Sequence, residues 1–312
     1  MNPALSIVIP AKDEEGSLSK LHQEIVAVLS HFKTTFEIII VDDGSTDNTF
    51  EKARGLAIKD RRVSVIKLRG NFGKSIALQT GFKAAKGAMV ITMDADLQDN
   101  PEELPKFIEK INQGYDLAVG WKKHRHDPWH KVIPSRLLNN YLIPFLTGIK
   151  IHDTNCGFKA YKKQVLDNLN LYGELYRYIP IFAAKNNFRI CEIEIKHRQR
   201  RFGKSKFGVE RNIKGMLDLI TVVFLTGYIK RPGHFFGGLG LLSFFVGFLI
   251  GLYITYLRIT TGSIQYHQPL LFLGVLLITV GFQLITTGLL AELLVHFNQK
   301  DTDVSKYIDR VV

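Results

Sequence analysis

Two long apolar runs near the C-terminus constrain this chain more than any other feature. Residues 235–257 and 269–291 are each 23 residues long and contain no charged residue. At about 1.5 Å per residue, a helix of this length reaches roughly 35 Å, which is enough to cross a membrane's ~30 Å hydrocarbon core. Buried helices of soluble proteins rarely stay uncharged for so long. The sequence therefore predicts two transmembrane helices.

The basic residues around these runs predict their orientation. The 11 residues between the runs contain a single cation, Arg258. The outer flanks carry Lys230, Arg231, Lys300, Lys306 and Arg310. Because Lys and Arg concentrate on the cytoplasmic side, we expect both outer flanks, and the large N-terminal region, to be cytoplasmic.

The segment before the first run is apolar but interrupted. Residues 209–229 contain Lys214 and Asp218, which favours an amphipathic helix lying at the membrane interface. A third, tilted span is the alternative, although charges in mid-helix are costly. The expected organisation is a catalytic domain at 1–205, an interfacial helix and linker at 206–232, and a membrane domain with a short cytoplasmic tail at 233–312. The glycines in the first run would let helices pack closely, either within one chain or in a homo-oligomer. The alternative is that they reflect the ordinary glycine content of membrane helices.

The amino-acid composition limits the classes of molecule that this chain is expected to bind. The net charge of +12 and pI near 9.5 favour an anionic ligand or membrane surface. Aromatic residues do not interleave with the basic ones, so a nucleic-acid partner is not expected.

Cys156 and Cys191 lack the spacing of a zinc site or a disulfide framework, which favours reduced thiols. The chain opens directly on a strand-like run at 5–9, so no secretory signal is expected.

Residues 1–200 alternate strand-like and helix-like segments. We expect strands at 6–10, 36–41, 63–68, 88–93 and 116–119, and helices at 17–32, 49–59, 75–86 and 101–113. This alternation predicts an α/β domain with a mostly parallel, Rossmann-like sheet covered by helices on both faces. Ligands of such sheets bind beyond the carboxyl ends of the strands. Three acid-rich stretches fall at those ends, at 12–15, 42–45 and 94–96.

The stretch MDADLQDNP, residues 93–101, carries paired carboxylates after a buried strand. Asp94 and Asp96 could cap the following helix, but Asp99 or Asn100 already occupies the capping position before the proline. Oxygen ligands on a short turn suit Mg²⁺ or Mn²⁺, and Gln98 would add another ligand directly or through water.

Two other polar stretches have less specific chemistry. Asp42 and Asp43 would bond ribose hydroxyls or a base edge, and an Asx-type turn at Gly44 is the alternative. Residues 122–131 contain three histidines among basic residues. A flexible basic loop near phosphates or lipid is a better interpretation of this stretch than a metal site.

Several motifs occur together in a characteristic order. They are SIVIP at 6–10, VDDGSTD at 41–47, NFGK at 71–74, MDADLQ at 93–98, GWKK at 120–123, PSR at 134–136, HDTNCGFKAY at 152–161 and RRFGKSK at 200–206. This ordered set resembles family 2 glycosyltransferases of the GT-A fold. The similarity is greatest to the polyprenyl-phosphate glycosyltransferases, the branch that resembles dolichyl-phosphate mannose synthase, and it covers residues 5–230.

The resemblance implies a role for each matching position. The donor nucleotide sugar would contact Pro10, Glu14, Asp42, Asp43, Lys74, Asp94 and Ala95. A Mg²⁺ or Mn²⁺ cofactor would bind Asp94, Asp96 and Gln98. The acceptor phosphate would bind Arg136, Arg200 and Lys206, and the catalytic residues would be Asp153 and Arg200. One departure is Lys12-Asp13, where relatives commonly carry Tyr-Asn, and it bears on base selection more than on catalysis.

The resemblance and the chemistry together predict an inverting, membrane-anchored glycosyltransferase. It would move a hexose from UDP- or GDP-sugar to a polyprenyl phosphate, such as undecaprenyl or dolichyl phosphate, at the cytoplasmic face. Asp153 would act as a base or orient the acceptor, with a structural turn as the alternative. The basic segment 200–206 would guide the lipid phosphate or simply contact anionic lipid.

Two other functions stay open at this point. One is transfer to another lipid, such as diacylglycerol, or to a polysaccharide, although the Gln-x-x-Arg-Trp motif of processive synthases is absent. The other is a non-catalytic membrane scaffold or flippase partner. The intact pair Asp94 and Asp96 argues against a non-catalytic role.

Overall fold

The computed structural model describes residues 3–32, 34–123, 141–167, 169–196, 198, 218–219, 221–224 and 232–298 of the 312-residue chain. The chain divides into two compact units, Met1–Val222 and Val223–Val312. Of the predicted interfacial helix and linker at 206–232, only 218–219, 221–224 and 232 belong to the described residues, and they are helical.

The N-terminal unit contains a seven-stranded sheet with the order β3-β2-β1-β4-β6-β5-β7. The strands are β1 (Leu5–Ala11), β2 (Phe36–Asp42), β3 (Val63–Lys67), β4 (Met89–Thr92), β5 (Leu117–Trp121), β6 (Lys159–Lys162) and β7 (Ile190–Glu194). Strand β6 is antiparallel to β4 and β5, while the other neighbours are parallel. The predicted, mostly parallel sheet is confirmed, and the sequence had not indicated β6 or β7.

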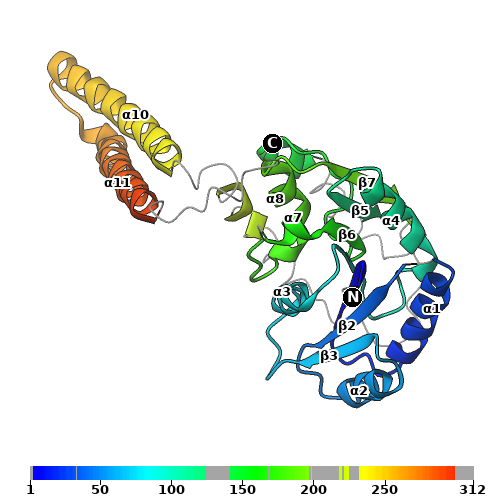
Figure 1. The fold of residues 1–312 in the computed structure, drawn as a ribbon. Coiled ribbons are helices and arrows are strands. Elements are labelled where there is room, and N and C mark those ends of the chain that lie inside the picture. The colour runs from blue at the N-terminus through cyan, green and yellow to red at the C-terminus, as the bar shows by residue number, and fades with distance from the viewer. Residues whose placement is uncertain are drawn as a thin grey trace. The chain divides into compact units, whose positions relative to one another are not determined.

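Helices follow most of these strands, as the alternating pattern predicted. They are α1 (Leu18–Ser30), α2 (Thr49–Lys59), α3 (Lys74–Ala84), α4 (Leu104–Asn112), α6 (Ile143–Thr147), α7 (Lys163–Asp167) and α8 (Ile179–Lys185). Short 3₁₀ turns, η1 (Pro101–Glu103) and η3 (Leu175–Tyr178), precede α4 and α8. Figure 1 shows α1, α2 and α4 along one side of the sheet and α3, α7 and α8 along the other.

Alternate residues of the central strands bury into the two helical layers. Ile7 and Ile9 of β1 join a core that includes the apolar faces of α1 and α4. Val8 points to the opposite face, where a Cβ on Gly81 of α3 would lie 2.3 Å from its methyl carbon. The strands are therefore buried on both faces, which explains their continuous apolar sequences. Because β1, β2 and β4 are parallel, the loops after them meet at one edge of the sheet.

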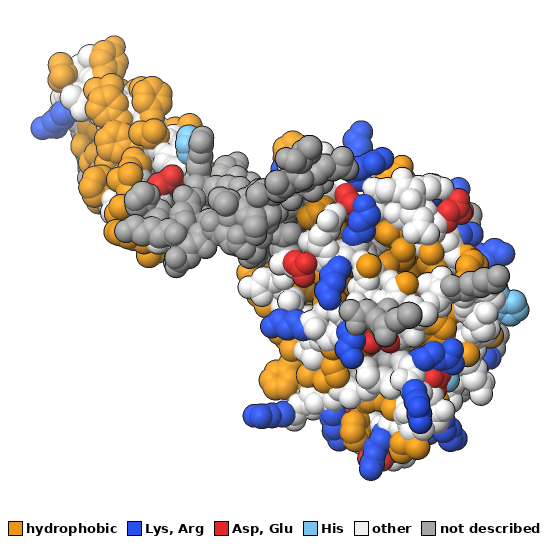
Figure 2. All heavy atoms as spheres, viewed as in Figure 1, with side chains coloured by type: hydrophobic (Ala, Val, Ile, Leu, Met, Phe, Trp, Pro, Cys, Tyr) orange, Lys and Arg blue, Asp and Glu red, His pale blue; other side chains and the backbone are white. Residues whose placement is uncertain are grey.

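The C-terminal unit is a helical hairpin of α10 (Pro232–Thr261), η4 (Gln265–His267) and α11 (Gln268–Asn298). Among the described residues, two helical segments are long and apolar enough to cross a membrane, each with mean hydropathy 2.2. Both predicted runs lie within them. Figure 2 shows hydrophobic side chains over the visible surface of this hairpin, as expected where lipid replaces water.

Two glycines of α10 let the helices of the hairpin approach closely. A Cβ on Gly240 would lie 2.7 Å from the Gly281 carbonyl oxygen, and one on Gly247 would lie 2.6 Å from the Gly274 carbonyl oxygen. Any larger residue at these positions would separate the helices, so glycine here serves packing. The other glycines of this run have no such contact within 4 Å; they are Gly237, Gly238 and Gly251.

Candidate active site

The loops after β1 and β2 are bonded to each other. Asp13 adopts φ 47°, a left-handed conformation that Asp and Asn tolerate better than most residues. Its Oδ1 accepts bonds from the Thr46 N–H at 2.7 Å and from the Thr46 hydroxyl at 3.2 Å, and its own N–H donates to Ser45 Oγ at 2.9 Å. Glu14 donates its N–H to Thr49 Oγ1 at 2.7 Å. Asp13, part of the departure from the family pattern, therefore shapes the loop.

Two buried carboxylates follow one another at the end of β2, with different surroundings. Asp43 accepts backbone N–H bonds at both oxygens, from Phe72 at 2.8 Å and Gly73 at 3.0 Å, so it holds the loop that leads into α3. Asp42 accepts a bond from the Ser45 N–H at 3.2 Å. Its Oδ2 has no hydrogen-bond partner within the described part of the chain. A buried acceptor without a partner is costly, so Asp42 is suited to an N–H or O–H donor of a ligand.

Asp94, two residues after β4, forms an ion pair with Lys74, the first residue of α3. Gly157 packs against this carboxylate, because a Cβ there would lie 2.5 Å from Asp94 Oδ1. Burial opposes ionisation of Asp94, but the ammonium groups of Lys74, Lys122 and Lys159 hold its pKa below the ordinary value. The carboxylate is therefore anionic at neutral pH and surrounded by cations.

The turn after Asp94 has a constrained backbone. Asp96 is buried, and its Oδ1 accepts the Gln98 N–H at 3.1 Å. Leu97, between them, adopts φ 61°, which costs about 1 kcal/mol or more for a residue with a Cβ. Asn100 caps η1 by accepting the Glu102 N–H at 3.1 Å, so of the two predicted capping residues Asn100 serves this role.

Arg198, from a distant part of the sequence, is hydrogen-bonded to this turn. Its backbone N–H donates to the Gln98 carbonyl at 3.0 Å. Its guanidinium donates to Asn100 Oδ1 at 2.6 Å and to Glu24 Oε2 of α1 at 2.7 Å. No local pattern indicated this residue, because its side-chain partners lie about a hundred or more positions away in the sequence.

Asp99 has a different role from the predicted capping one. It is fully buried, and its Oδ1 pairs with Lys122 Nζ at 2.8 Å. Burial opposes the charge on Lys122, but Asp99 outweighs it and raises the pKa of this lysine. Lys122 was expected to begin a flexible basic loop at 122–131; instead it is part of the buried ion pair. Residues 124–131 of that loop lie outside the described residues.

Lys159 brings another buried ammonium group to this region. Its side chain is only 2% exposed, and its Nζ donates to the Thr154 carbonyl at 3.2 Å. Burial, reinforced by the charge of Lys74, lowers the pKa of Lys159 to about 8.

The pKa of Lys159 predicts how stability depends on pH. The folded chain releases this proton near pH 8, whereas the unfolded chain holds it up to its ordinary value of 10.5. Between these values the unfolded state binds more protons, so this lysine makes the free energy of unfolding rise with pH. We expect Lys159→Met to remove that rise. Urea titrations of both proteins at several pH values across this window test it, and parallel pH curves would contradict it.

Asp153 is held by backbone hydrogen bonds near the end of β5. It is 1% exposed, and its oxygens accept backbone N–H bonds from Asn155 at 3.1 Å and Lys122 at 3.4 Å. Glu192 of β7 accepts the N–H of His152 at 2.8 Å and that of Asp153 at 3.4 Å. The surroundings position Asp153 firmly, and its predicted role in catalysis stays a prediction.

The ligand set at the end of β4 fits a hard divalent cation. Asp94 and Asp96, the predicted ligands, carry carboxylate oxygens, and Gln98 lies on the same turn. Within the described residues, no group of three or more His, Cys, Asp or Glu side chains is arranged to bind a metal. A cation at Asp94 and Asp96 would thus need phosphate oxygens or water to complete its shell, as is usual for Mg²⁺.

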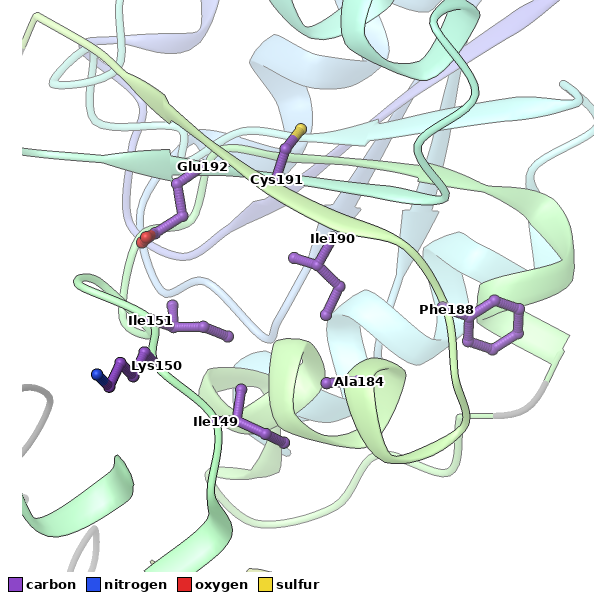
Figure 3. A pocket seen from close by; sticks show the side chains of 8 residues that line it. All are labelled: Ile149, Lys150, Ile151, Ala184, Phe188, Ile190, Cys191 and Glu192. Atoms are coloured by element: carbon purple, nitrogen blue, oxygen red, sulfur yellow. The ribbon is translucent and has the colours of Figure 1, made fainter. Parts of the chain in front are cut away.

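A pocket of about 330 Å³ lies elsewhere, between β7, α8 and the segment 149–151. Figure 3 shows its lining side chains: Ile149, Lys150, Ile151, Ala184, Phe188, Ile190, Cys191 and Glu192. None of the predicted site residues lines it. Its mostly apolar lining lacks the paired carboxylates, so the strand-end loops remain the candidate active site.

The remaining predicted residues are only partly placed. Pro10 is half-buried in β1 and Ala95 is buried in the loop after β4. Arg136, Arg200 and Lys206 lie outside the described residues. The structure brings together Asp94, Lys74 and the Asp42–Asp43 loops, and it adds Lys122, Asp99, Lys159 and Arg198, which sequence reasoning did not assign to the site.

Comparison with known proteins decides the family. Residues 6–169 match the family described as Glycosyl transferase family 2. The chain belongs to this family. It is 37% identical to the dodecaprenyl-phosphate galacturonate synthase of Rhizobium johnstonii, across 99% of this chain and 92% of the relative. It is 33% identical to the undecaprenyl-phosphate 4-deoxy-4-formamido-L-arabinose transferase of Aeromonas hydrophila, across 96% and 90%.

Solved structures place the family 2 chain in the GT-A fold. Glucosyl-3-phosphoglycerate synthase from Mycobacterium tuberculosis, in complex with Mn²⁺, UDP and phosphoglyceric acid, matches with a TM-score of 0.58 at 18% identity. The match covers 72% of this chain and 78% of that one. The predicted family, GT-A architecture and glycosyltransferase class are therefore confirmed.

Proposed function

We propose that this family 2 glycosyltransferase transfers a hexose from a UDP- or GDP-sugar to a polyprenyl phosphate at the cytoplasmic face of a membrane. The observation that carries the proposal is the extent of the match. The relatives that align with 99% and 96% of this chain, apolar helices included, are both named for a polyprenyl phosphate. A soluble acceptor would not require the apolar hairpin.

The strand-end loops supply the groups that a nucleotide sugar needs. Asp42 offers a buried carboxylate oxygen to an N–H of the base or a ribose hydroxyl. Lys74 and the N-terminus of α3 offer positive charge to the diphosphate. Mg²⁺ or Mn²⁺ bound at Asp94, Asp96 and Gln98 would neutralise charge that develops on the departing diphosphate.

The transfer is a single displacement with inversion. A phosphate oxygen of the lipid attacks the anomeric carbon of the sugar from the face opposite the diphosphate. The bond between that carbon and the diphosphate oxygen breaks, and the nucleoside diphosphate leaves with the electron pair. With a second pKa of about 6, a phosphate monoester is already largely anionic at pH 7. The nucleophile then needs little help from a base, which gives buried Asp153 an orienting role.

Cationic residues would receive the lipid phosphate. Arg136, Arg200 and Lys206 are the proposed ligands. Arg198, whose backbone N–H donates to the Gln98 carbonyl, lies two residues before the basic segment 200–206. The excess of basic residues on both outer flanks of the apolar hairpin supports a cytoplasmic catalytic unit.

Sugar transfer by the purified full-length chain in detergent tests the proposal. The reaction contains Mg²⁺, undecaprenyl phosphate and one donor at a time from a panel of UDP- and GDP-sugars that includes uronic acids. We expect a sugar-linked undecaprenyl phosphate, detected by mass spectrometry, from at least one donor. Diacylglycerol and a polysaccharide serve as competing acceptors. Transfer to either of these but not to undecaprenyl phosphate, or no transfer from any donor, would overturn the proposal.

A further inference from the structure

The ion pair between Lys74 and Asp94 joins two residues whose proposed ligands differ. Asp94 is a proposed metal ligand, yet its Oδ1 is in contact with the Lys74 ammonium. Lys74 is proposed to bind the donor diphosphate, yet its charge is directed at a carboxylate. Each group is therefore the other's partner in this structure, and the proposed ligands would offer each of them a different partner.

Helix stability does not explain the position of Lys74. It is the first residue of α3, where the helix dipole disfavours a cation. The side chain is also largely buried, with its Nζ 5.1 Å from the centroid of the Tyr176 ring. A cation kept in this position is suited to an anion that arrives at the helix N-terminus.

The surroundings limit how Asp94 can respond. Gly157 packs directly against the carboxylate, and the Asp94 backbone N–H lies 3.5 Å from Asp99 Oδ2. The aspartate is therefore confined, whereas Lys74 has a long side chain with an aromatic ring beside it. Of the two partners, the lysine is the one that can move.

We propose that Lys74 is an exchangeable counter-ion: it neutralises Asp94 before the donor binds, and it transfers to the donor diphosphate when a divalent cation takes its place. The inference rests on the proposed function, because it assumes a diphosphate donor and a metal at Asp94. The exchange predicts that the divalent cation and the diphosphate bind synergistically. The cation alone has to displace Lys74 without compensation, while the diphosphate gives Lys74 a new partner, so each ligand promotes binding of the other.

Binding measurements on the full-length chain test the exchange without any sugar transfer. Affinity for Mn²⁺ is measured by electron paramagnetic resonance, alone and with saturating UDP or GDP. We expect Lys74→Met to bind Mn²⁺ alone at least about tenfold more tightly than the original chain, because a competing positive charge is gone. We also expect its gain in Mn²⁺ affinity on adding the nucleotide to shrink by at least about tenfold.

A lysine of strand β6 provides the matched control. Lys162 pairs with Asp116 at 2.7 Å, and Asp116 precedes β5, at the opposite edge of the sheet from the site. Lys162→Met should leave both Mn²⁺ affinities unchanged. Lys74→Arg keeps the charge and should preserve the synergy, which provides a readout if Lys74→Met does not fold.

Each outcome decides the inference independently of the transferase assay. Unchanged or weaker Mn²⁺ binding by Lys74→Met would overturn it, as would the absence of Mn²⁺ binding to the original chain with either nucleotide. A Lys74→Arg variant without synergy would also overturn it. If the exchange is observed but undecaprenyl phosphate is not glycosylated, the proposed acceptor is wrong and the role of Lys74 stands.

Discussion

Asp96→Ala is expected to lower sugar transfer by about 10²–10³-fold, because a lost metal contact removes several kcal/mol of stabilisation from the departing diphosphate. Asp96 is buried, and its Oδ1 accepts the Gln98 N–H at 3.1 Å. The measurement is the initial rate of sugar transfer over a range of Mg²⁺ concentrations.

A matched aspartate separates this effect from a general loss of structure. Asp167 is exposed at the end of α7, so Asp167→Ala should retain full activity. Asp96→Ala should also require more Mg²⁺ for its residual activity. A variant that keeps more than half of the original rate, at unchanged Mg²⁺ dependence, would exclude Asp96 as a metal ligand.

Lys122→Met is expected to reduce the free energy of unfolding by about 3–5 kcal/mol, since it leaves Asp99 buried without its partner. The Asp99 side chain is 0% exposed and that of Lys122 is 13% exposed, with 2.8 Å between their charged atoms. The same change should lower activity, because Asp99 lies beside the backbone of Asp94. The midpoint of urea unfolding, followed by near-ultraviolet circular dichroism, measures the loss of stability.

The neighbouring lysine is the control for that prediction. Lys123 pairs with Glu194 at 3.2 Å, but both side chains are about half exposed, at 48% and 50%. Exposed pairs contribute about 0–1 kcal/mol, so Lys123→Met should change stability little. A double variant, Lys122→Met with Asp99→Leu, should recover part of the loss because no buried charge remains. Equal effects of Lys122→Met and Lys123→Met would contradict this account.

Much of the fold was predictable because its signals are local. The predicted strands and helices through residue 119 match the observed ones to within one or two residues when the 3₁₀ turn η1 is counted with α4, since each has an apolar pattern of the right period. Strand β6 was not predicted. It has only four residues and includes two lysines, one of them buried. Its place in the sheet depends on pairing with β4 and β5, which are distant in the sequence.

The candidate site was predictable in part for the same reason. Acids at the ends of strands are visible in the sequence, and the turn with Asp94 and Asp96 was identified from its spacing. The role of Asp99 was not, because capping and ion pairing look alike until its partner Lys122 is known. The same holds for Arg198, whose importance comes from contacts with Gln98, Asn100 and Glu24.

Local sequence was sufficient to establish the apolar hairpin, the alternating α/β unit and the carboxylates at its strand ends. These features depend on the length of short sequence segments and on the period of their apolar residues. Both can be read from the sequence without knowing the fold. Tertiary structure alone decided which carboxylates are paired with ammonium groups and which keep an open oxygen. Electrostatic energy depends on distance and burial, and folding sets both by bringing together residues such as Lys74 and Asp94.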